Sequence, residues 1–352
     1  MAVINYLGRR AHAIGNEHLE VVVSVEGGHI ASILDKATGV NPLWVPPWKS
    51  IEPSSYDPAK NPEYGLNAES KLLAGILGHN LCLDLFGGPT DEEAAAGIPV
   101  HGEGSVAPYD ISVGGDTLTQ VAILETCQLK FTRRIRLAAG SRRLEISETA
   151  ENLSPCDRPV AWTQHVTLGP PFLAKGRTLF GSTATKSKTM ESDFTGGYGH
   201  MAIAAEFDWP HVPLVGGGTE DLRVFTSREK SGAYSTHLMD PSRDDAWFVA
   251  WNPDCKLAIA YIWKRTDFPW LGIWEENLGR TSAPWNGQAI TRGMEFGASP
   301  FPESRRAMID RGKTFQTPGY RWIPARTAVT SEYAALVAPA SSIEEAVGLI
   351  GS

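Results

Sequence analysis

Short β-strand patterns that stop at glycine or proline dominate this chain. Leu19–Val25 (LEVVVSV) is followed by Gly27-Gly28 and then by His29–Leu34 (HIASIL), the pattern of a β-hairpin with a glycine-rich turn. Arg143–Ala150 (RLEISETA) alternates between apolar and polar residues, which is typical of a strand with one buried face. Apolar residues at every second position do not form one face of a helix, so the sequence predicts an all-β fold.

Further strands are expected along most of the chain, at Leu118–Glu125, Cys127–Leu137, Leu222–Thr226, Ala246–Trp251, Leu257–Trp263, Trp270–Trp274 and Arg326–Val337. One face is ambiguous, because Arg133 has the same parity as the apolar residues of its strand. Helix patterns are limited to Asp91–Ala96 and to a C-terminal segment after Ser342, which has capping-box spacing to Glu345. With no repeat and no clear linker, residues 1–352 are predicted to form a single β-sandwich domain.

Composition and charge narrow the possible partners. The formal net charge of -8 argues against nucleic acid or an anionic membrane as the main partner. No run of about 18 apolar residues occurs, and the N-terminus has no secretory pattern, so we expect a cytoplasmic protein without a membrane span. The four cysteines are far apart, which predicts reduced thiols rather than a zinc or disulfide framework. Two long segments rich in Pro, Gly, Ser and Thr, 46–64 and 178–218, are expected to be loops that cover a site.

Two histidines stand in a glycine-rich segment, Gly78–Gly104. Glycine lets the backbone turn sharply and lets a ligand approach closely. His101, between Val100 and Gly102, is difficult to pack as simple core and is the stronger functional candidate. His79 is equally compatible with a structural hydrogen bond.

A third histidine and a glutamate are carried by two predicted strands. In Pro159–Phe172 (PVAWTQHVTLGPPF), His165 shares a small, polar face with Thr163 and Thr167, while Trp162 points to the other face. Glu295 stands between Met294 and Phe296 and is flanked by Gly293 and Gly297. An apolar environment raises the pKa of a carboxyl group, which suits a general base.

Aromatic and acidic residues complete the candidate set. The chain has 11 tryptophans, and aromatic rings stack on the C–H faces of sugars, so Trp162 and Trp274 are candidate sugar contacts. Glu275 and Glu276 are adjacent and point to opposite faces of a strand, so they cannot act as one carboxylate pair. Either one together with Glu295 would resemble a glycosidase pair if the carboxyls were about 5–9.5 Å apart.

These segments, in this order, resemble the aldose 1-epimerase (galactose mutarotase-like) superfamily. The resemblance covers residues 19 to 302 and is carried by the opening hairpin, by Gly78–Phe86 with Val100-His101-Gly102, by Arg143–Ser154 running into Trp162–Phe172, and by Ile290–Phe296. It implies a large two-sheet antiparallel supersandwich with a sugar cleft on its concave face. After His101-Gly102 the chain departs from the pattern, since Glu103, Gly104 and Ser105 stand where many relatives have a hydrophobic residue and an arginine.

The resemblance also implies a reaction, the interconversion of the α and β anomers of a sugar. Glu295 would take the proton from the anomeric hydroxyl, His165 would protonate the ring oxygen, and His101 would bind near that oxygen. Histidine, with an ordinary pKa of about 6.5, exchanges protons near neutral pH. Neither a cofactor nor a metal is expected. His79, Asp84, Trp162, Trp274 and Glu275 are the predicted substrate-binding residues; the position of the family's sugar-binding aspartate stays open, with Asp84 as one candidate.

Three functions remain open from the sequence: an epimerase, a non-catalytic sugar-binding protein, and a lyase or hydrolase on the same fold. The expected partner is a small-molecule sugar, and a neutral one. Between Leu72 and Leu129 there is no Lys or Arg that would attract a sugar phosphate, although Arg280 and Arg292 lie closer to Glu295 in the sequence. A hexose-6-phosphate epimerase is therefore the less favoured form of the main hypothesis.

Overall fold

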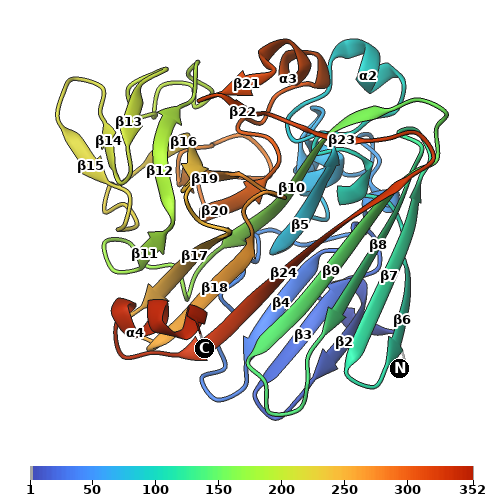
Figure 1. The fold of residues 1–352 in the computed structure, drawn as a ribbon, viewed down its shortest axis with the longest axis horizontal. Coiled ribbons are helices and arrows are strands. Elements are labelled where there is room, and N and C mark those ends of the chain that lie inside the picture. The colour runs from blue at the N-terminus through green and yellow to red at the C-terminus, as the bar shows by residue number, and fades with distance from the viewer. Residues whose placement is uncertain (1–2, 352) are drawn as a thin grey trace.

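Two large antiparallel sheets pack face to face in the computed structural model, which describes residues 3–351 (Figure 1). The larger sheet has 12 strands and the smaller has eight. Across the larger sheet the order is β1 (Ile4–Tyr6), β2 (Arg9–Gly15), β3 (Leu19–Ser24), β4 (Ile30–Asp35), β5 (His79–Asp84), β10 (Arg158–Leu168), β20 (Ile290–Gly297), β19 (Trp270–Asn277), β16 (Ser231–Met239), β12 (Ala184–Thr189) and β13 (Glu206–Asp208), and β23 (Arg321–Ile323) pairs with β10.

The smaller sheet has the order β11 (Leu179–Ser182), β17 (Asp245–Asn252), β18 (Leu257–Lys264), β24 (Ala328–Pro339), β9 (Arg143–Asn152), β8 (Leu129–Arg136), β7 (Thr117–Leu124) and β6 (Asp110–Gly114). Two small hairpins pair β14 (His211–Pro213) with β15 (Thr219–Asp221) and β21 (Lys313–Thr314) with β22 (Thr317–Pro318). This arrangement is the predicted all-β, two-sheet sandwich.

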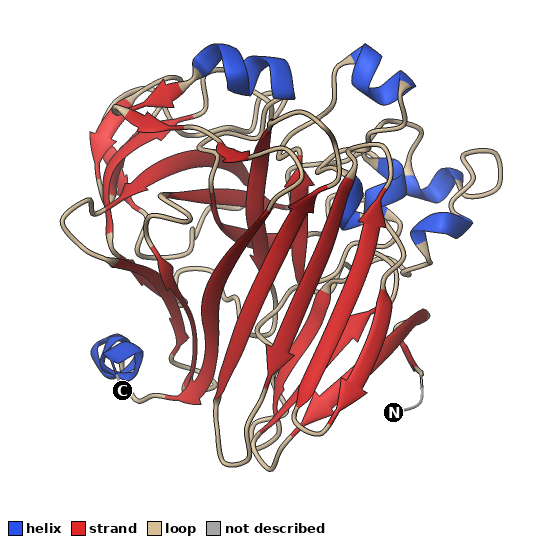
Figure 2. Ribbon diagram, turned by 45° about the vertical axis from the view of Figure 1, so that its right-hand side comes forward, coloured by secondary structure: helices blue, strands red, loops and turns tan. Residues whose placement is uncertain are grey.

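Helices are few and short, and they lie at the periphery of the sandwich (Figure 2). The α-helices are α1 (Ser70–Leu73), α2 (Asp91–Ala95), α3 (Arg305–Arg311) and α4 (Ile343–Gly348), and the 3-10 helices are η1 (Pro53–Ser55), η2 (Pro62–Tyr64), η3 (Glu103–Ser105) and η4 (Leu349–Gly351). At the N-terminus of α4, Ser342 accepts a hydrogen bond from the Glu345 backbone N–H at 3.2 Å. Both predicted helices therefore exist. None of the helices among residues 3–351 is long and apolar enough to cross a membrane.

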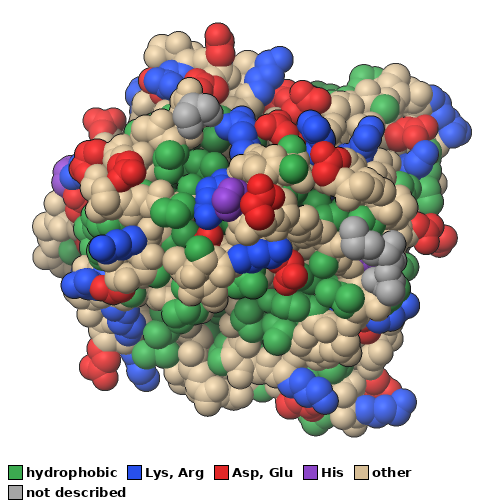
Figure 3. Space-filling model, turned by 90° about the horizontal axis from the view of Figure 1, so that it is seen from below, with side chains coloured by type: hydrophobic (Ala, Val, Ile, Leu, Met, Phe, Trp, Pro, Cys, Tyr) green, Lys and Arg blue, Asp and Glu red, His purple; other side chains and the backbone are tan. Residues whose placement is uncertain are grey.

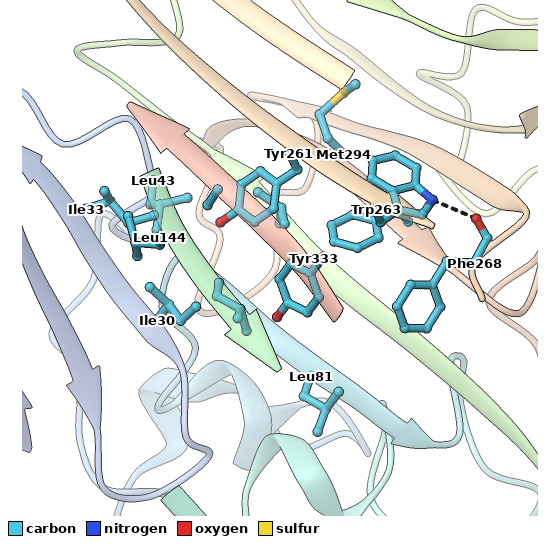
Figure 4. Close-up of a cluster of buried hydrophobic side chains, with 14 of the residues drawn as sticks. Ile30, Ile33, Leu43, Leu81, Leu144, Tyr261, Trp263, Phe268, Met294 and Tyr333 are labelled. Atoms are coloured by element: carbon cyan, nitrogen blue, oxygen red, sulfur yellow. Dashed lines mark hydrogen bonds between the residues drawn. The ribbon is translucent and has the colours of Figure 1, made fainter. Parts of the chain in front are cut away.

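The main hydrophobic core fills the space between the two sheets. Figure 4 shows Leu81 from β5 and Met294 from β20 together with Tyr261 from β18 and Tyr333 from β24. Trp263 stacks on Phe296 with ring centroids 4.3 Å apart. Because one face of each sheet is covered in this way, the remaining face of the larger sheet is the one available to build a site.

A buried polar network crosses this core. Arg133 and Glu148 are fully buried and form an ion pair, with Arg133 Nε 2.6 Å from Glu148 Oε1. The Glu148 carboxylate also accepts hydrogen bonds from Trp162 Nε1 at 3.0 Å, from Gln164 Nε2 at 2.6 Å and from the Tyr333 hydroxyl at 2.7 Å. Arg133 therefore does lie on the same face of β8 as its apolar neighbours. Its side chain points into the core, where Glu148 neutralises its charge.

The structure corrects two expectations about loops and strands. Leu222–Thr226 is not a strand and has a single bridge from Val224 to Leu179. The segment 178–218 is not one long loop, because it contains β11 and β12 and the short strands β13 and β14. Ser187 of β12 is fully buried beside His237, so a polar sequence there still forms sheet. On the face shown in Figure 3, acidic and basic side chains are interspersed around hydrophobic ones.

Candidate active site

Strands β10, β20 and β19 carry the centre of the candidate site. In the register of these strands, His165 lies directly opposite Glu295, and Glu295 lies opposite Gly272. Residues paired across adjacent strands project from the same face of a sheet. The sheet register therefore brings together His165 and Glu295, which are 130 positions apart in the sequence.

The loop that contains His101 is fixed against the end of β5. The His101 backbone N–H donates to the Gly87 carbonyl at 3.1 Å, and the Leu83 N–H donates to the His101 carbonyl at 3.2 Å. His101 has a φ of 65° and Gly102 a φ of 75°. A Cβ at Gly102 would lie 2.3 Å from the Leu83 carbonyl oxygen, so only glycine allows this close approach.

His101, His165 and Glu295 line one cavity of about 280 Å³. Its size is near the lower end of the range of about 300–1,000 Å³ that is typical of small-molecule sites. The lining combines these three residues with apolar, aromatic and paired charged side chains: Glu69, Leu72, Leu73, Ile76, Phe86, Gly87, Gly88, Val100, Met190, Phe194, Tyr234, Trp274, Arg280, Trp285 and Pro302. A mostly apolar wall with a few polar groups suits a small ligand that is both hydroxylated and carbon-rich.

Glu295 and His165 form a close pair within this cavity. Glu295 Oε1 lies 3.0 Å from His165 Nε2, and the two residues are 2% and 5% exposed. Burial raises the pKa of Glu295 well above its ordinary value. Burial and the neighbouring His101 ring lower the pKa of His165 well below its ordinary value. Both shifts favour the uncharged forms, a protonated Glu295 carboxyl and a His165 ring with a single N–H proton.

The Glu295 oxygen has unused hydrogen-bonding capacity. Its distance to His165 Nε2 is short, but the geometry is not that of a hydrogen bond, and Oε1 has no hydrogen-bond partner among the described residues. A buried polar atom without a partner is costly. A ligand hydroxyl in the cavity would supply the missing partner.

Hydrogen bonds set the orientation of both imidazole rings. His101 Nδ1 donates to the Phe86 carbonyl, which can only accept, so in the neutral ring Nε2 is the unprotonated nitrogen. His165 Nδ1 lies 2.9 Å from the Thr167 hydroxyl, which leaves Nε2 toward Glu295. The two ring centroids are 5.0 Å apart. Burial also lowers the pKa of His101, so both rings are expected to be neutral near pH 7.

Four predicted binding residues lie outside this cavity, which corrects their expected placement. His79 and Trp162 face the core between the sheets, where His79 hydrogen-bonds Tyr261 and Gln164 and Trp162 donates to Glu148. Asp84 is buried and paired with Arg158 and Arg305 at 3.0 and 2.7 Å. Glu275 is buried on the opposite face of β19 from Trp274, beside Arg292 at 3.4 Å. Trp274 lines the cavity.

The sequence singled out neither Glu69 nor Trp285 of the cavity wall, and it indicated Arg280 only as a cation near Glu295. Glu69 and Arg280 form an ion pair at 3.2 Å, and the Arg280 guanidinium lies 4.8 Å from the ring centroid of Trp285. Trp285 in turn contacts Trp274, with ring centroids 6.0 Å apart. The high tryptophan content indicated an aromatic cluster but gave no positions, and no local pattern links Glu69 to Arg280.

No group of three or more His, Cys, Asp and Glu side chains within residues 3–351 is arranged to hold a metal ion. The polar atoms at the cavity instead belong to proton-exchanging groups and to one ion pair. This arrangement can bind a hydroxylated ligand, and it can move a proton between Glu295, His165 and that ligand.

Comparisons with known proteins give the same fold. A scan of the sequence against protein-family models finds no match, and a search of curated proteins finds none either. Solved structures do match: a provisionally named aldose 1-epimerase from Klebsiella pneumoniae superposes with a TM-score of 0.70 at 12% identity, over 97% of this chain and 82% of that one.

Two further structures are similar. A provisionally named aldose 1-epimerase from Escherichia coli has a TM-score of 0.62 at 12% identity and covers 94% of this chain and 100% of its own. A galactose mutarotase related enzyme from Lactobacillus acidophilus has a TM-score of 0.59 at 13% identity, with coverage of 94% and 98%. The chain therefore has the galactose mutarotase-like fold, as its sequence motifs predicted. At these identities the likeness concerns the fold alone.

Proposed function

We propose that this protein is an aldose 1-epimerase that interconverts the α and β anomers of a neutral sugar. The observation that carries the proposal is the buried pair of Glu295 and His165, 3.0 Å apart on the wall of a cavity that His101 also lines. Ring opening needs one group that removes a proton and another that supplies one, both within reach of adjacent sugar oxygens. A carboxyl with a raised pKa and an imidazole with a lowered pKa suit these two roles.

The proposed reaction begins when the Glu295 carboxylate takes the proton from the anomeric hydroxyl. The O–H electron pair forms the carbonyl, the bond from the anomeric carbon to the ring oxygen breaks, and the ring oxygen receives a proton from His165. After rotation about the adjacent C–C bond, the same hydroxyl attacks the other face of the carbonyl. Its proton returns to His165, and Glu295 returns a proton to the anomeric oxygen, so no atom is gained or lost.

The reactive protonation state requires the carboxyl proton to move from Glu295 to His165. Oε1 and Nε2 are 3.0 Å apart but not aligned as a hydrogen bond, so the transfer requires a reorientation of the Glu295 carboxyl or a ligand hydroxyl that relays the proton. A sugar hydroxyl that donates to the carboxylate stabilises its ionised form. Binding of the sugar would therefore prepare the base that the reaction needs.

Two other functions fit the site less well. A glycosidase would need a second carboxylate facing Glu295, but Glu275 lies on the opposite face of β19, and Glu276 is held by the Gly279 and Arg280 backbone N–H groups at 2.7 and 2.9 Å. A lyase would need a free cation beside an acidic sugar, whereas Arg280 is paired with Glu69. A sugar-binding protein without activity is the remaining alternative, and it is distinguished by a rate measurement.

The proposal is tested by polarimetry on freshly dissolved α-anomers of neutral hexoses and of hexose 6-phosphates. We expect the protein to accelerate the approach to equilibrium for a neutral hexose more than for its phosphate, because the cation in the cavity is already paired. A tenfold preference for the phosphate that is weakened by salt would contradict the neutral-sugar assignment. Rates equal to the protein-free control for every sugar would contradict the epimerase.

Gly293 is predicted to be essential for the position of the base. A Cβ at residue 293 would lie 2.3 Å from Glu295 Oε1, so Gly293→Ala must displace the carboxylate. A displacement of about 1 Å can cost about 100-fold in rate, and we expect a loss of that order in kcat by polarimetry. Gly88→Ala is the matched control, since Gly88 also lines the cavity but a Cβ there meets nothing within 4 Å. Equal rates for the two variants would show that the position of this carboxylate does not limit the reaction.

A further inference from the structure

An open groove lies next to the inner cavity. It has a volume of about 740 Å³ and shares Glu69, Gly88, Val100, Phe194, Arg280 and Trp285 with the inner cavity. Because the same six residues line both spaces, the groove borders the inner cavity directly. The groove is the larger of the two, so the site as a whole is bigger than the inner cavity that holds the reactive groups.

The walls of the groove combine aromatic and hydroxyl-bearing side chains. Phe194 is 37% exposed at the junction, and Tyr198 lies farther out, where its hydroxyl donates to Glu276 at 3.2 Å. Asn67, Thr281 and Ser282 are exposed along the same groove. Aromatic faces that stack on C–H groups, next to amide and hydroxyl groups that exchange hydrogen bonds, form a surface suited to a pyranose ring.

The charges at the junction are neutralised within the protein. Glu69 and Arg280 pair at 3.2 Å, and the Arg280 guanidinium lies over the ring of Trp285. A phosphate or carboxylate group of a ligand in the groove would have to compete with Glu69 for the Arg280 guanidinium. The groove therefore favours an uncharged extension of the ligand.

We propose that the preferred substrate is a neutral reducing oligosaccharide of at least two sugar units. Its reducing-end unit occupies the inner cavity at Glu295 and His165, and the next unit lies in the groove between Phe194 and Thr281. This inference rests on the proposed epimerase function and extends it to the class of substrate. It predicts that the contacts in the groove, which are remote from the reacting carbon, increase kcat/KM.

The test compares a disaccharide with its own reducing-end monosaccharide in polarimetry, with each freshly dissolved as one anomer. For the wild-type protein we expect kcat/KM to be at least about tenfold higher for the disaccharide, the range that one additional set of contacts provides. Thr281→Trp fills the groove without lining the inner cavity, and it should remove this preference while leaving the monosaccharide rate unchanged. Gln288→Trp, an exposed position on the same connection that lines neither space, is the matched control and should keep the preference. Equal kcat/KM for the two sugars in the wild-type protein, or a preference that survives in Thr281→Trp, would overturn the proposal.

A binding measurement separates this proposal from the proposed function. Calorimetric titration of the same two sugars into the wild-type protein and Thr281→Trp reports on the groove without any turnover. Tighter binding of the disaccharide that Thr281→Trp abolishes, with no acceleration of mutarotation, would refute the epimerase and keep the oligosaccharide site. Mutarotation of both sugars with equal affinity and equal rate would keep the epimerase and refute the oligosaccharide site.

Discussion

Replacing Glu295 by Gln should reduce the rate of mutarotation by at least about 100-fold, because general-base catalysis contributes about 10²–10⁴. The change preserves the size of the side chain and removes the carboxylate, so sugar binding should remain largely intact. Polarimetry gives the rate, and calorimetry gives the affinity. Glu69→Gln, which alters the other carboxylate of the cavity wall, should affect kcat far less. If Glu69→Gln caused the large loss and Glu295→Gln did not, Glu69 would be the base.

Glu295→Gln should also change the stability of the folded protein in a pH-dependent way, which can be measured without any activity assay. The pKa of Glu295 is raised in the folded protein, so the native state gains stability while this carboxyl is protonated and loses it as the pH rises from the ordinary carboxyl range through the raised pKa. Gln carries no charge at any pH. The Tm of Glu295→Gln relative to the wild-type protein should therefore be higher at pH 8 than at pH 5. A difference in Tm that is the same at both values would show that the carboxyl is not destabilised by burial.

Replacing Glu148 by Gln should lower the free energy of unfolding by about 3–5 kcal/mol, because it leaves the Arg133 charge buried without a counter-ion. Donors from Arg133, Trp162, Gln164 and Tyr333 converge on the two carboxylate oxygens. A glutamine has one carbonyl oxygen, and its amide group would face some of these donors. Denaturant unfolding measures the loss.

Glu151→Gln on the same strand is the matched control for this effect. Glu151 pairs with Lys130 at 3.7 Å, and both side chains are more than 40% exposed. Exposed pairs of this kind contribute at most about 1 kcal/mol, so Glu151→Gln should change stability little. If both variants lost the same small amount, the ion pair of Arg133 and Glu148 would contribute no more than a surface contact.

The sequence predicted the strands well where one face of the strand is buried and the other is exposed to solvent. In β9, Leu144, Ile146 and Ala150 point to the core while Glu145 is exposed, and this alternation is visible in the sequence. It also placed His165 on a small, polar face, whereas Glu295 was found from its apolar neighbours Met294 and Phe296. Period-2 alternation is a local property, so it can be found without knowledge of the partners of a strand.

Only the tertiary structure decided which polar residues face the cavity. Strand β10 is buried along almost its whole length. Alternation puts Gln164 and His165 on opposite faces of the strand, but it does not say which face lines the core and which lines the cavity. His79, a predicted sugar contact, is on the core face and joins the network of Glu148 through Gln164. Which face becomes the cavity depends on which sheet packs against the other, and that is a contact between distant segments of the chain.

The sequence also did not predict which loops complete the cavity. Glu69 and Arg280 are 211 residues apart and meet because the connection from β4 to β5 and the connection from β19 to β20 both reach the cavity. The sequence by itself determined the all-β class, the strands and the residue types available for proton transfer, because these depend on local periodicity and side-chain chemistry. The register of β10 with β20 and the closure of the loops over them decided which of those residues act together, because these depend on packing between segments that no local pattern links.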